Sequence, residues 1–279
     1  MTDGARLQGA RWRTLYWWIL AVVFAAGTAL PFIWMVATSF KTEPDAFAHP
    51  LSLVAHPFTL VEYAKLVALE PFGLYFLNSA VAAVSGTLGV LITSTLAGYA
   101  VARLRFRSRT VVFFVVLGTM MIPTQVTMIP SFLIMRFLGW INTYWVLTVP
   151  YLVSPFGVFI MRQAFSVLPR ELEEAAEIDG CGRLRGLWSV FLPNVTTSLA
   201  TVVIFTFTAI WNDFFWPLVM TSSSRMWTLQ VGLASMQNQI PGRWPIIMAG
   251  TFLVTLPMLV IFLMFQRYFV QGYVSSGLK

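Results

Sequence analysis

Residues 71–102 read PFGLYFLNSAVAAVSGTLGVLITSTLAGYAVA, a run without a single Asp, Glu, Lys or Arg. A helix needs about 20 consecutive apolar residues to cross the hydrocarbon core of a bilayer, so this run is long enough to span a membrane. Five further charge-free runs occur along the chain, and we expect one transmembrane helix in each. These runs are Thr14–Phe40, Val111–Met135, Phe137–Met161, Gly186–Asn212 and Trp244–Gln266.

The composition points the same way. Of the 279 residues, 58% are hydrophobic and 10% are charged, whereas a soluble domain carries about 25% charged residues; a water-soluble enzyme is therefore excluded. The net charge of +7 comes from basic residues clustered between apolar runs, a pattern of membrane topology rather than of a nucleic-acid-binding face. One cysteine, Cys181, excludes an intramolecular disulfide, and two histidines, each followed by proline, do not favour a metal site.

These patterns predict an all-α polytopic membrane protein with six transmembrane helices and both termini in the cytoplasm. That orientation places most of the 18 Lys and Arg on the inner side, as the positive-inside rule requires. We expect a cytoplasmic N-terminal tail over residues 1–13 and a single transmembrane domain over 14–279, with a long cytoplasmic loop over 163–193 between the fourth and fifth spans. The expected spans are roughly 14–39, 73–101, 111–134, 139–161, 195–217 and 244–266.

The cytoplasmic loop contains a short acidic helix in the stretch LPRELEEAAEIDG, residues 168–180. Pro169 suits the first helical position, the glutamates that follow face the positive end of the helix dipole, and Gly180 can adopt the left-handed conformation that ends a helix. A second short helix should follow and end at Pro193. Its apolar face would be formed by Leu184, Leu187, Trp188 and Phe191. The residues alone leave two interpretations open, a solvated surface helix or a docking element for a soluble partner.

The spacing in this loop resembles the EAA loop of ABC importer permeases, whose pattern is E-A-A-x3-G-x9-I-x-L-P. Here Glu174-Ala175-Ala176 is followed after three residues by Gly180, and after nine more by Val190-Phe191-Leu192-Pro193, with valine where the family has isoleucine. In that family the loop forms a coupling helix that sits in a cleft of the ATPase subunit. The resemblance therefore implies a set of coupling residues. They are Glu173, Glu174, Ala175, Ala176, Asp179, Gly180, Leu192 and Pro193.

Further stretches resemble the maltose-type carbohydrate permeases, and in particular the shorter of their two permease subunits. They are Ala97–Arg103, Trp211–Pro217, and Phe265–Val270 with Gly272 and Gly277–Lys279. Asp213 stands where that family usually carries glutamate. The resemblance implies an ATP-driven importer of a sugar or related polyol, working by alternating access in a bacterial or archaeal cytoplasmic membrane. Its partners would be a second permease subunit, two ATPase subunits, an extracytoplasmic solute-binding protein and membrane lipid, with no nucleic acid.

The sequence lacks the motif with which many proteins bind ATP, and this absence favours ATP hydrolysis by a separate subunit. The sequence has no G-x-x-x-x-G-K-[ST] phosphate loop, so this chain should bind no cofactor of its own, and ATP and magnesium would belong to the ATPase subunits. No H-E-x-x-H or G-x-S-x-G stretch occurs either, so we assign no catalytic residue, no enzyme activity and no metal site. A self-contained secondary transporter or channel is the alternative, although the spans of such carriers usually hold more ionisable residues than these do.

Two further groups have both a functional and a structural interpretation. Near the outer end of the fifth span, aromatic rings could meet the apolar faces of a sugar while an amide and a carboxylate bond its hydroxyls, or the same residues could form an interfacial belt. These residues are Trp211, Asn212, Asp213 and Phe215. In the next outer segment, four residues would contact the solute-binding protein or form an ordinary connector. They are Gln237, Asn238, Gln239 and Arg243.

Overall fold

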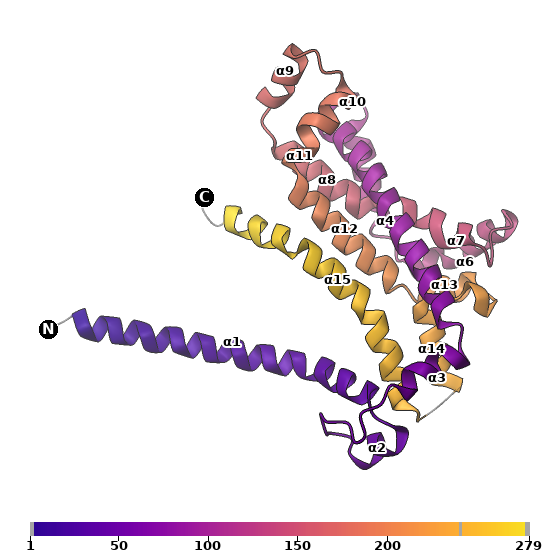
Figure 1. The fold of residues 1–279 in the computed structure, drawn as a ribbon. Helices are drawn as coiled ribbons and strands as arrows, with labels where there is room; N and C mark the ends of the chain where they lie inside the picture. The colour runs from indigo at the N-terminus through magenta and orange to yellow at the C-terminus, as the bar shows by residue number, and fades with distance from the viewer. Residues whose placement is uncertain (1–2, 240–241, 277–279) are drawn as a thin grey trace. The chain divides into compact units, whose positions relative to one another are not determined.

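The computed structural model describes residues 3–239 and 242–276, with side chains over 14–237 and 242–267. Within those ranges every regular element is helical (Figure 1), which confirms the all-α prediction for that part of the chain. The α-helices are α1 (Asp3–Ser39), α2 (Glu43–Ala48), α3 (Val61–Leu69), α4 (Phe72–Arg103), α5 (Arg109–Thr119), α6 (Thr124–Phe137), α7 (Tyr144–Thr148), α8 (Pro155–Val167), α9 (Glu171–Ile178), α10 (Arg183–Gly186), α11 (Leu192–Asn194), α12 (Thr196–Trp211), α13 (Phe215–Met220), α14 (Leu229–Gln239) and α15 (Trp244–Ser276). The remaining helical turns are η1 (Val149–Leu152), η2 (Leu187–Phe191) and η3 (Ser224–Met226).

Four segments in the described ranges are long and apolar enough to cross a membrane, and there are up to six if each of two bent helix pairs counts as one span. The four are Thr14–Ser39, Phe72–Arg103, Tyr144–Val167 and Trp244–Arg267. The bent pairs are Arg109–Thr119 with Thr124–Phe137, and Arg183–Asn194 with Thr196–Trp211. The chain is therefore a multi-pass helical membrane protein.

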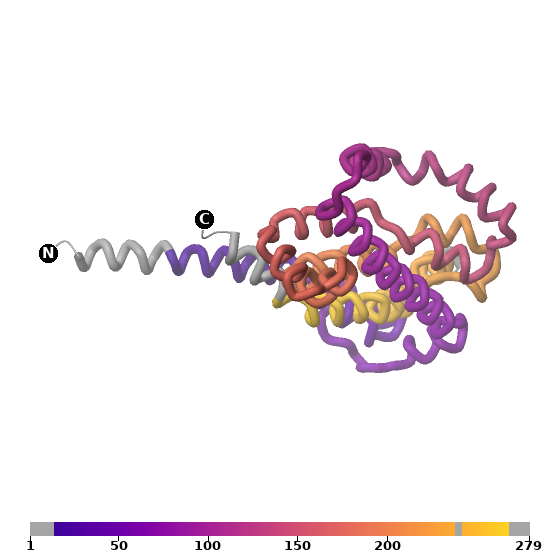
Figure 2. Tube along the Cα trace, turned by 90° about the horizontal axis from the view of Figure 1, so that it is seen from above, coloured from indigo at the N-terminus to yellow at the C-terminus, as the bar shows by residue number. Residues whose placement is uncertain are grey.

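The expectation of one continuous helix in each apolar run is wrong for the third, fourth and fifth runs; in the fifth, Arg183–Asn194 and Thr196–Trp211 are bent by 84° relative to each other. α5 and α6 are separated by a break that ends at Pro123, and their axes differ by 97°, a turn visible in Figure 2. The fourth run is divided into α7, the 3-10 turn η1 and α8, with Pro150 and Pro155 at the starts of the latter two. Proline lacks an N–H and restricts the residue before it, so prolines at these places favour a break followed by a new helix.

Two other boundaries also differ from expectation. α1 begins at Asp3, so the described residues of the expected tail, 3–13, are part of the first helix. In the fifth run, α12 ends at Trp211, and the residues expected to complete the span form the separate short helix α13.

The helices fall into two compact units, residues 1–70 with 236–255, and residues 71–235 with 256–279. In the second unit α4 is the central helix and packs along α8 and α12 (Figure 1). A β-carbon on Gly98 would lie 2.7 Å from the Cβ of Met161, and one on Gly89 would lie 2.9 Å from the Cα of Leu152. The small residues of α4 therefore allow its neighbours to approach closely.

Asn78 ties the other end of α4 to two distant segments. Its side chain is fully buried, and its Nδ2 donates to the carbonyl oxygens of Arg225 and Trp227, each at 2.9 Å. Its Oδ1 accepts a hydrogen bond of 2.6 Å from the hydroxyl of Tyr144 on α7. Both polar atoms of the buried Asn78 amide therefore have hydrogen-bond partners, and these bonds fix the η3 turn against α4.

The first unit contains α1, α2, α3, the last part of α14 and the first part of α15, and it encloses a buried cation. Lys41 has no exposed surface, and its Nζ donates to the carbonyl oxygens of His49 and Ser52 at 2.8 and 2.7 Å. The backbone N–H of His56 donates to Asp45 at 2.9 Å, and this bond lowers the pKa of the Asp45 carboxyl below its usual value, against the opposing effect of burial. The proline-rich segment after α1 is therefore held by specific polar contacts.

The close packing of α4 can be tested with two glycines of the same helix. Gly98→Ala should destabilise the protein by about 1–3 kcal/mol, the usual cost of overpacking, because its new Cβ would collide with α8. Gly73→Ala should be neutral or slightly stabilising, since nothing lies within 4 Å of the added carbon and alanine is the better helix former. Thermal unfolding of the purified protein in detergent measures both. Equal melting temperatures for the two variants would contradict the close approach.

Candidate functional site

The acidic helix α9 lies beyond the C-terminal end of α4 (Figure 1). It begins two residues after Pro169 rather than at that proline, and its first turn contains Glu171, Glu173 and Glu174. Negative charge at this end stabilises a helix through its dipole. The acidic helix expected between the fourth and fifth spans is therefore present.

The two alanines of α9 differ in exposure. Ala176 is 6% exposed and faces the rest of the chain, whereas Ala175 is exposed. Ile178 follows Ala175 at helical i,i+3 spacing and is 86% exposed. Together with the exposed Glu174 and Asp179, these residues form a small apolar surface with acidic neighbours. Sequence reasoning missed Ile178, although its spacing from Ala175 was a signal that could have found it.

Gly180 ends α9 in the expected left-handed conformation, with φ of +72°. The N–H of Cys181 donates to the carbonyl oxygen of Ala176 at 2.8 Å, and the N–H of Gly180 donates to that of Glu177 at 3.0 Å. This pair of bonds is the Schellman motif, which satisfies carbonyls left free at a helix end. The chain therefore reverses sharply here and leaves the outer face of α9 uncovered.

The segment after this turn differs from expectation. α10, the π-helical turn η2 and α11 form one helical run to Asn194, so Pro193 lies inside the run and not at its end. Leu187 and Phe191 are buried, but Leu184 and Trp188 are 66% and 58% exposed, so only two of the four apolar residues are packed inside the chain.

The remaining coupling candidates lie at the base of the loop. Glu173 forms an ion pair of 3.7 Å with Arg103 of α4, and Leu192 packs against the buried cluster that includes Phe191. Pro193 is exposed. The structure therefore separates the candidates into an outward group at Glu174, Ala175, Asp179 and Gly180 and a group that joins the loop to the helices.

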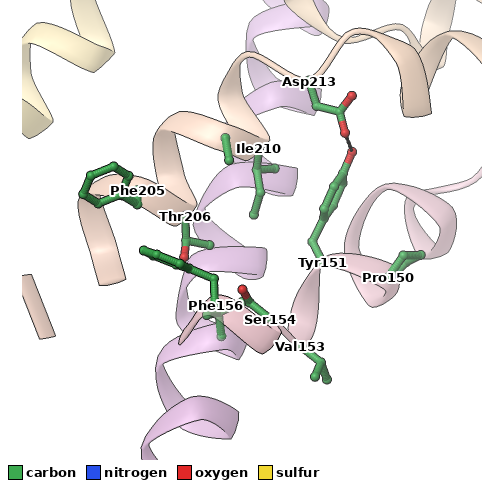
Figure 3. A pocket seen from close by; sticks show the side chains of 11 residues that line it. Pro150, Tyr151, Val153, Ser154, Phe156, Phe205, Thr206, Ile210 and Asp213 are labelled. Carbon is green, nitrogen blue, oxygen red and sulfur yellow. Dashed lines mark hydrogen bonds between the residues drawn. The ribbon is translucent and has the colours of Figure 1, made fainter. Parts of the chain in front are cut away.

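A cavity of about 410 Å³ lies between η1, α8 and α12, and Figure 3 shows its lining. Asp213 points into it, and one carboxylate oxygen accepts a hydrogen bond of 2.7 Å from the hydroxyl of Tyr151. The other oxygen accepts the N–H of Trp216 at 3.2 Å. Ser154 and Thr206 add hydroxyls to a lining that is otherwise mainly apolar. Sequence reasoning found Asp213 but missed Tyr151, whose position 62 residues earlier gives no local signal.

The other three residues predicted near Asp213 do not line this cavity. Trp211 is 2% exposed and its ring stacks on Phe207 at 5.5 Å between centroids. Asn212 is exposed, its Nδ2 bonds to Thr208, and its Oδ1 accepts from Gln230. Phe215 is 43% exposed. Of the four, the structure brings only Asp213 to the cavity.

The predicted outer contact residues are partly described. Gln237 is exposed, and Arg243 forms an ion pair of 3.8 Å with Glu43 in which both side chains are about half exposed. The side chains of Asn238 and Gln239 lie outside the described residues.

Comparison with known proteins gives three consistent similarities. Residues 94–274 match the family of binding-protein-dependent transport system inner membrane components. The chain is 34% identical to the arabinooligosaccharides transport system permease protein AraQ of Halalkalibacterium halodurans, over 94% of this chain and 96% of that one. It is 35% identical to the trehalose/maltose transport system permease protein MalG of Thermococcus litoralis, over 93% and 94%.

A solved structure shares the fold. It is a chain of a bacterial ABC transporter involved in the import of the acidic polysaccharide alginate, with a TM-score of 0.83 over 96% of this chain and 99% of that one. The identity is 23%, so this similarity concerns the fold. The sequence resemblance to ABC importer permeases is confirmed.

The left-handed end of α9 can be tested with two neighbouring glycines. Gly180→Ala should destabilise this turn by about 1–2 kcal/mol, because a β-carbon is unfavourable at positive φ. Gly182→Ala should have little effect, since that residue has φ of −63° and neither glycine has an atom within 4 Å of an added carbon. Hydrogen exchange at the amides of residues 177–181 measures the difference. Equal protection in the two variants would contradict the role of the left-handed turn.

Proposed function

The chain belongs to the family of binding-protein-dependent transport system inner membrane components, and from that premise we propose that it moves a sugar or related polyol through the cytoplasmic membrane of a bacterium or archaeon. It would act as one permease subunit of an ATP-driven importer. Relatives named for arabinooligosaccharide and for trehalose/maltose transport support a carbohydrate substrate.

The outward surface of α9 is the observation that carries this proposal. A helix with an exposed isoleucine and alanine between acidic residues suits insertion into a cleft of another protein, because exposed apolar side chains gain by leaving water. Since the sequence has no phosphate loop, the energy for uphill transport has to come from another chain. We propose that α9 is the coupling helix and that two ATPase subunits bind ATP and magnesium.

Alternating access would follow from movement of this helix. ATP binding would close the ATPase pair and draw its docked helices together, and the attached spans would turn the cavity from inward to outward access. ATP hydrolysis would then reset the complex. Two sites lie at opposite ends of α4, with α9 beside Arg103 and the η3 turn beside Asn78, an arrangement that supports motor docking and solute delivery on opposite sides.

The cavity at Asp213 is our candidate for the part of the solute path in this chain. A carboxylate, a phenol and two hydroxyls in an aromatic and apolar lining are the groups that bind sugar hydroxyls and stack on sugar faces. Trp211 would support this site by packing against Phe207. Asn212 and Phe215 would lie near the cavity without lining it.

The proposed complex provides a partner for each of the remaining exposed surfaces. A second permease subunit and lipid would cover α1, which exposes large side chains such as Trp18 and Phe24 at 67% and 74%. The solute-binding protein would contact the segment from Gln237 to Arg243. Both termini would be cytoplasmic, as the basic residues indicate.

Site-directed cross-linking tests the docking of α9. In the assembled importer with Cys181→Ser, Ala175→Cys should form a cross-link to the ATPase subunit, because that position is exposed. Ala176→Cys is the matched control and should react much less, since the native side chain is 6% exposed. Absence of any ATPase cross-link from Ala175→Cys would contradict the proposal.

Reconstitution separates the importer from a self-contained carrier. In liposomes, uptake of a carbohydrate held by the binding protein should require all subunits together with ATP. This chain alone should give no gradient-driven uptake, because its spans contain few ionisable groups to couple to an ion. Uptake by the purified chain alone would reject the importer and support the secondary-transporter alternative.

A further inference from the structure

Arg103 is a buried cation at the last residue of α4. Its side chain is 6% exposed, and a charge in such a place is costly unless its donors find partners. The guanidinium has five N–H donors in a rigid planar arrangement, so it can bind several groups at once. From its position in the sequence, close to other arginines, Arg103 would only add to the positive charge that orients the chain in the membrane. Its contacts show a more specific role.

Two of these contacts satisfy the C-terminal end of α8. The Nε of Arg103 donates to the carbonyl oxygen of Phe165 at 3.0 Å, and Nη2 donates to that of Leu168. In a continuing helix the Phe165 carbonyl would accept the N–H four residues later, but that residue is Pro169, which has no N–H. Arg103 therefore supplies the donor that proline removes, at a helix end where positive charge is favourable.

The same guanidinium also contacts the acidic helix and the segment after it. Its Nη1 lies 3.7 Å from a carboxylate oxygen of Glu173 in the first turn of α9. Its central carbon lies 5.3 Å from the centroid of the Phe191 ring in η2, within cation–π range. Phe191 in turn packs against Tyr99 and Phe165. One side chain thus connects α4, α8, α9 and η2.

The ion pair between Arg103 and Glu173 matters because a cavity lies between α9 and the end of α4. A polar cavity of about 460 Å³ separates them, lined by arginines and glutamates that include Arg105, Arg183 and Glu177. A polar gap transmits displacement poorly, because it lacks the dense apolar packing that makes interiors resist compression. The Arg103–Glu173 pair crosses this gap directly.

We propose that Arg103 is a positioning residue for energy coupling, which holds α9 in a fixed relation to the ends of α4 and α8. A displacement of α9 then moves both helices together, through the carboxylate of Glu173 on one side and the two α8 carbonyls on the other. This inference rests on the proposed docking of α9 to an ATPase and assigns the residue that transmits its movement.

The test uses Glu173→Gln and Arg103→Lys in the complete importer, with Arg107→Gln as the matched control because Arg107 is an exposed arginine in the next loop. Glu173→Gln removes the one carboxylate of α9 that pairs with Arg103 and keeps the bonds from Arg103 to α8. Lysine keeps the charge of Arg103 but lacks the planar fork that reaches several acceptors. Solute uptake and ATP hydrolysis are measured on the same proteoliposomes.

In both variants the solute taken up per ATP hydrolysed should fall about tenfold, within the usual range of coupling free energies between two sites. Assembly of the complex and its ATP hydrolysis should persist, and the double variant should lose no more than the worse single variant, because both changes break one connection. Arg107→Gln should keep the normal ratio. A residue with a merely structural role would lower assembly, hydrolysis and uptake in parallel.

The Ala175→Cys cross-link is repeated in each variant. A retained cross-link with a reduced ratio supports the inference. A retained cross-link with an unchanged ratio in both variants, or parallel loss of assembly and hydrolysis, overturns the inference and leaves the docking of α9 intact. Absence of the cross-link without either substitution overturns the proposed function itself, and with it the role of Arg103.

Discussion

Backbone groups released where helices break must find partners within the chain, because the hydrocarbon core of a membrane offers no water to replace them. Side chains from distant elements satisfy this requirement at several breaks. The hydroxyl of Thr93 donates to the carbonyl oxygen of Leu152 at 2.8 Å, and the indole of Trp216 donates to that of Val146 at 2.9 Å. Arg103 does the same for the end of α8. The breaks and their polar partners together define the fold of the second unit.

This constraint explains which parts of the fold could be predicted. Charge-free runs were sufficient to indicate segments long enough to cross a membrane, since length and composition decide whether a helix crosses a bilayer. The breaks after α5 and α7 could not be placed, because a proline in a span can kink a helix or end it depending on what replaces the lost hydrogen bond. Those replacements come from residues such as Thr93 and Trp216, which a local pattern cannot assign to a partner.

The candidate site shows the same division at the scale of single residues. Gly180 was predictable because glycine adopts the left-handed conformation more readily than any other residue. The orientation of α9 was not, since a short helix can turn either face inward and only contacts with other elements decide it. Those contacts turn Ala176 inward and leave Ala175 and Ile178 outside. The pairing of Asp213 with Tyr151 was hidden for the same reason, because the two residues meet only when η1 packs against the end of α12.

The length of α9 connects its stability with its function. An isolated helix shorter than about 12–15 residues is marginal in water, and α9 has 8. Its helical state therefore depends on contacts at its two ends, the Schellman bonds around Gly180 and the pair between Glu173 and Arg103. When α9 is held at both ends in this way it moves as a rigid body, because bending the helix would break the end contacts that keep it helical. The interactions that fold α9 are consequently those through which a force applied to its outer face reaches α4 and α8.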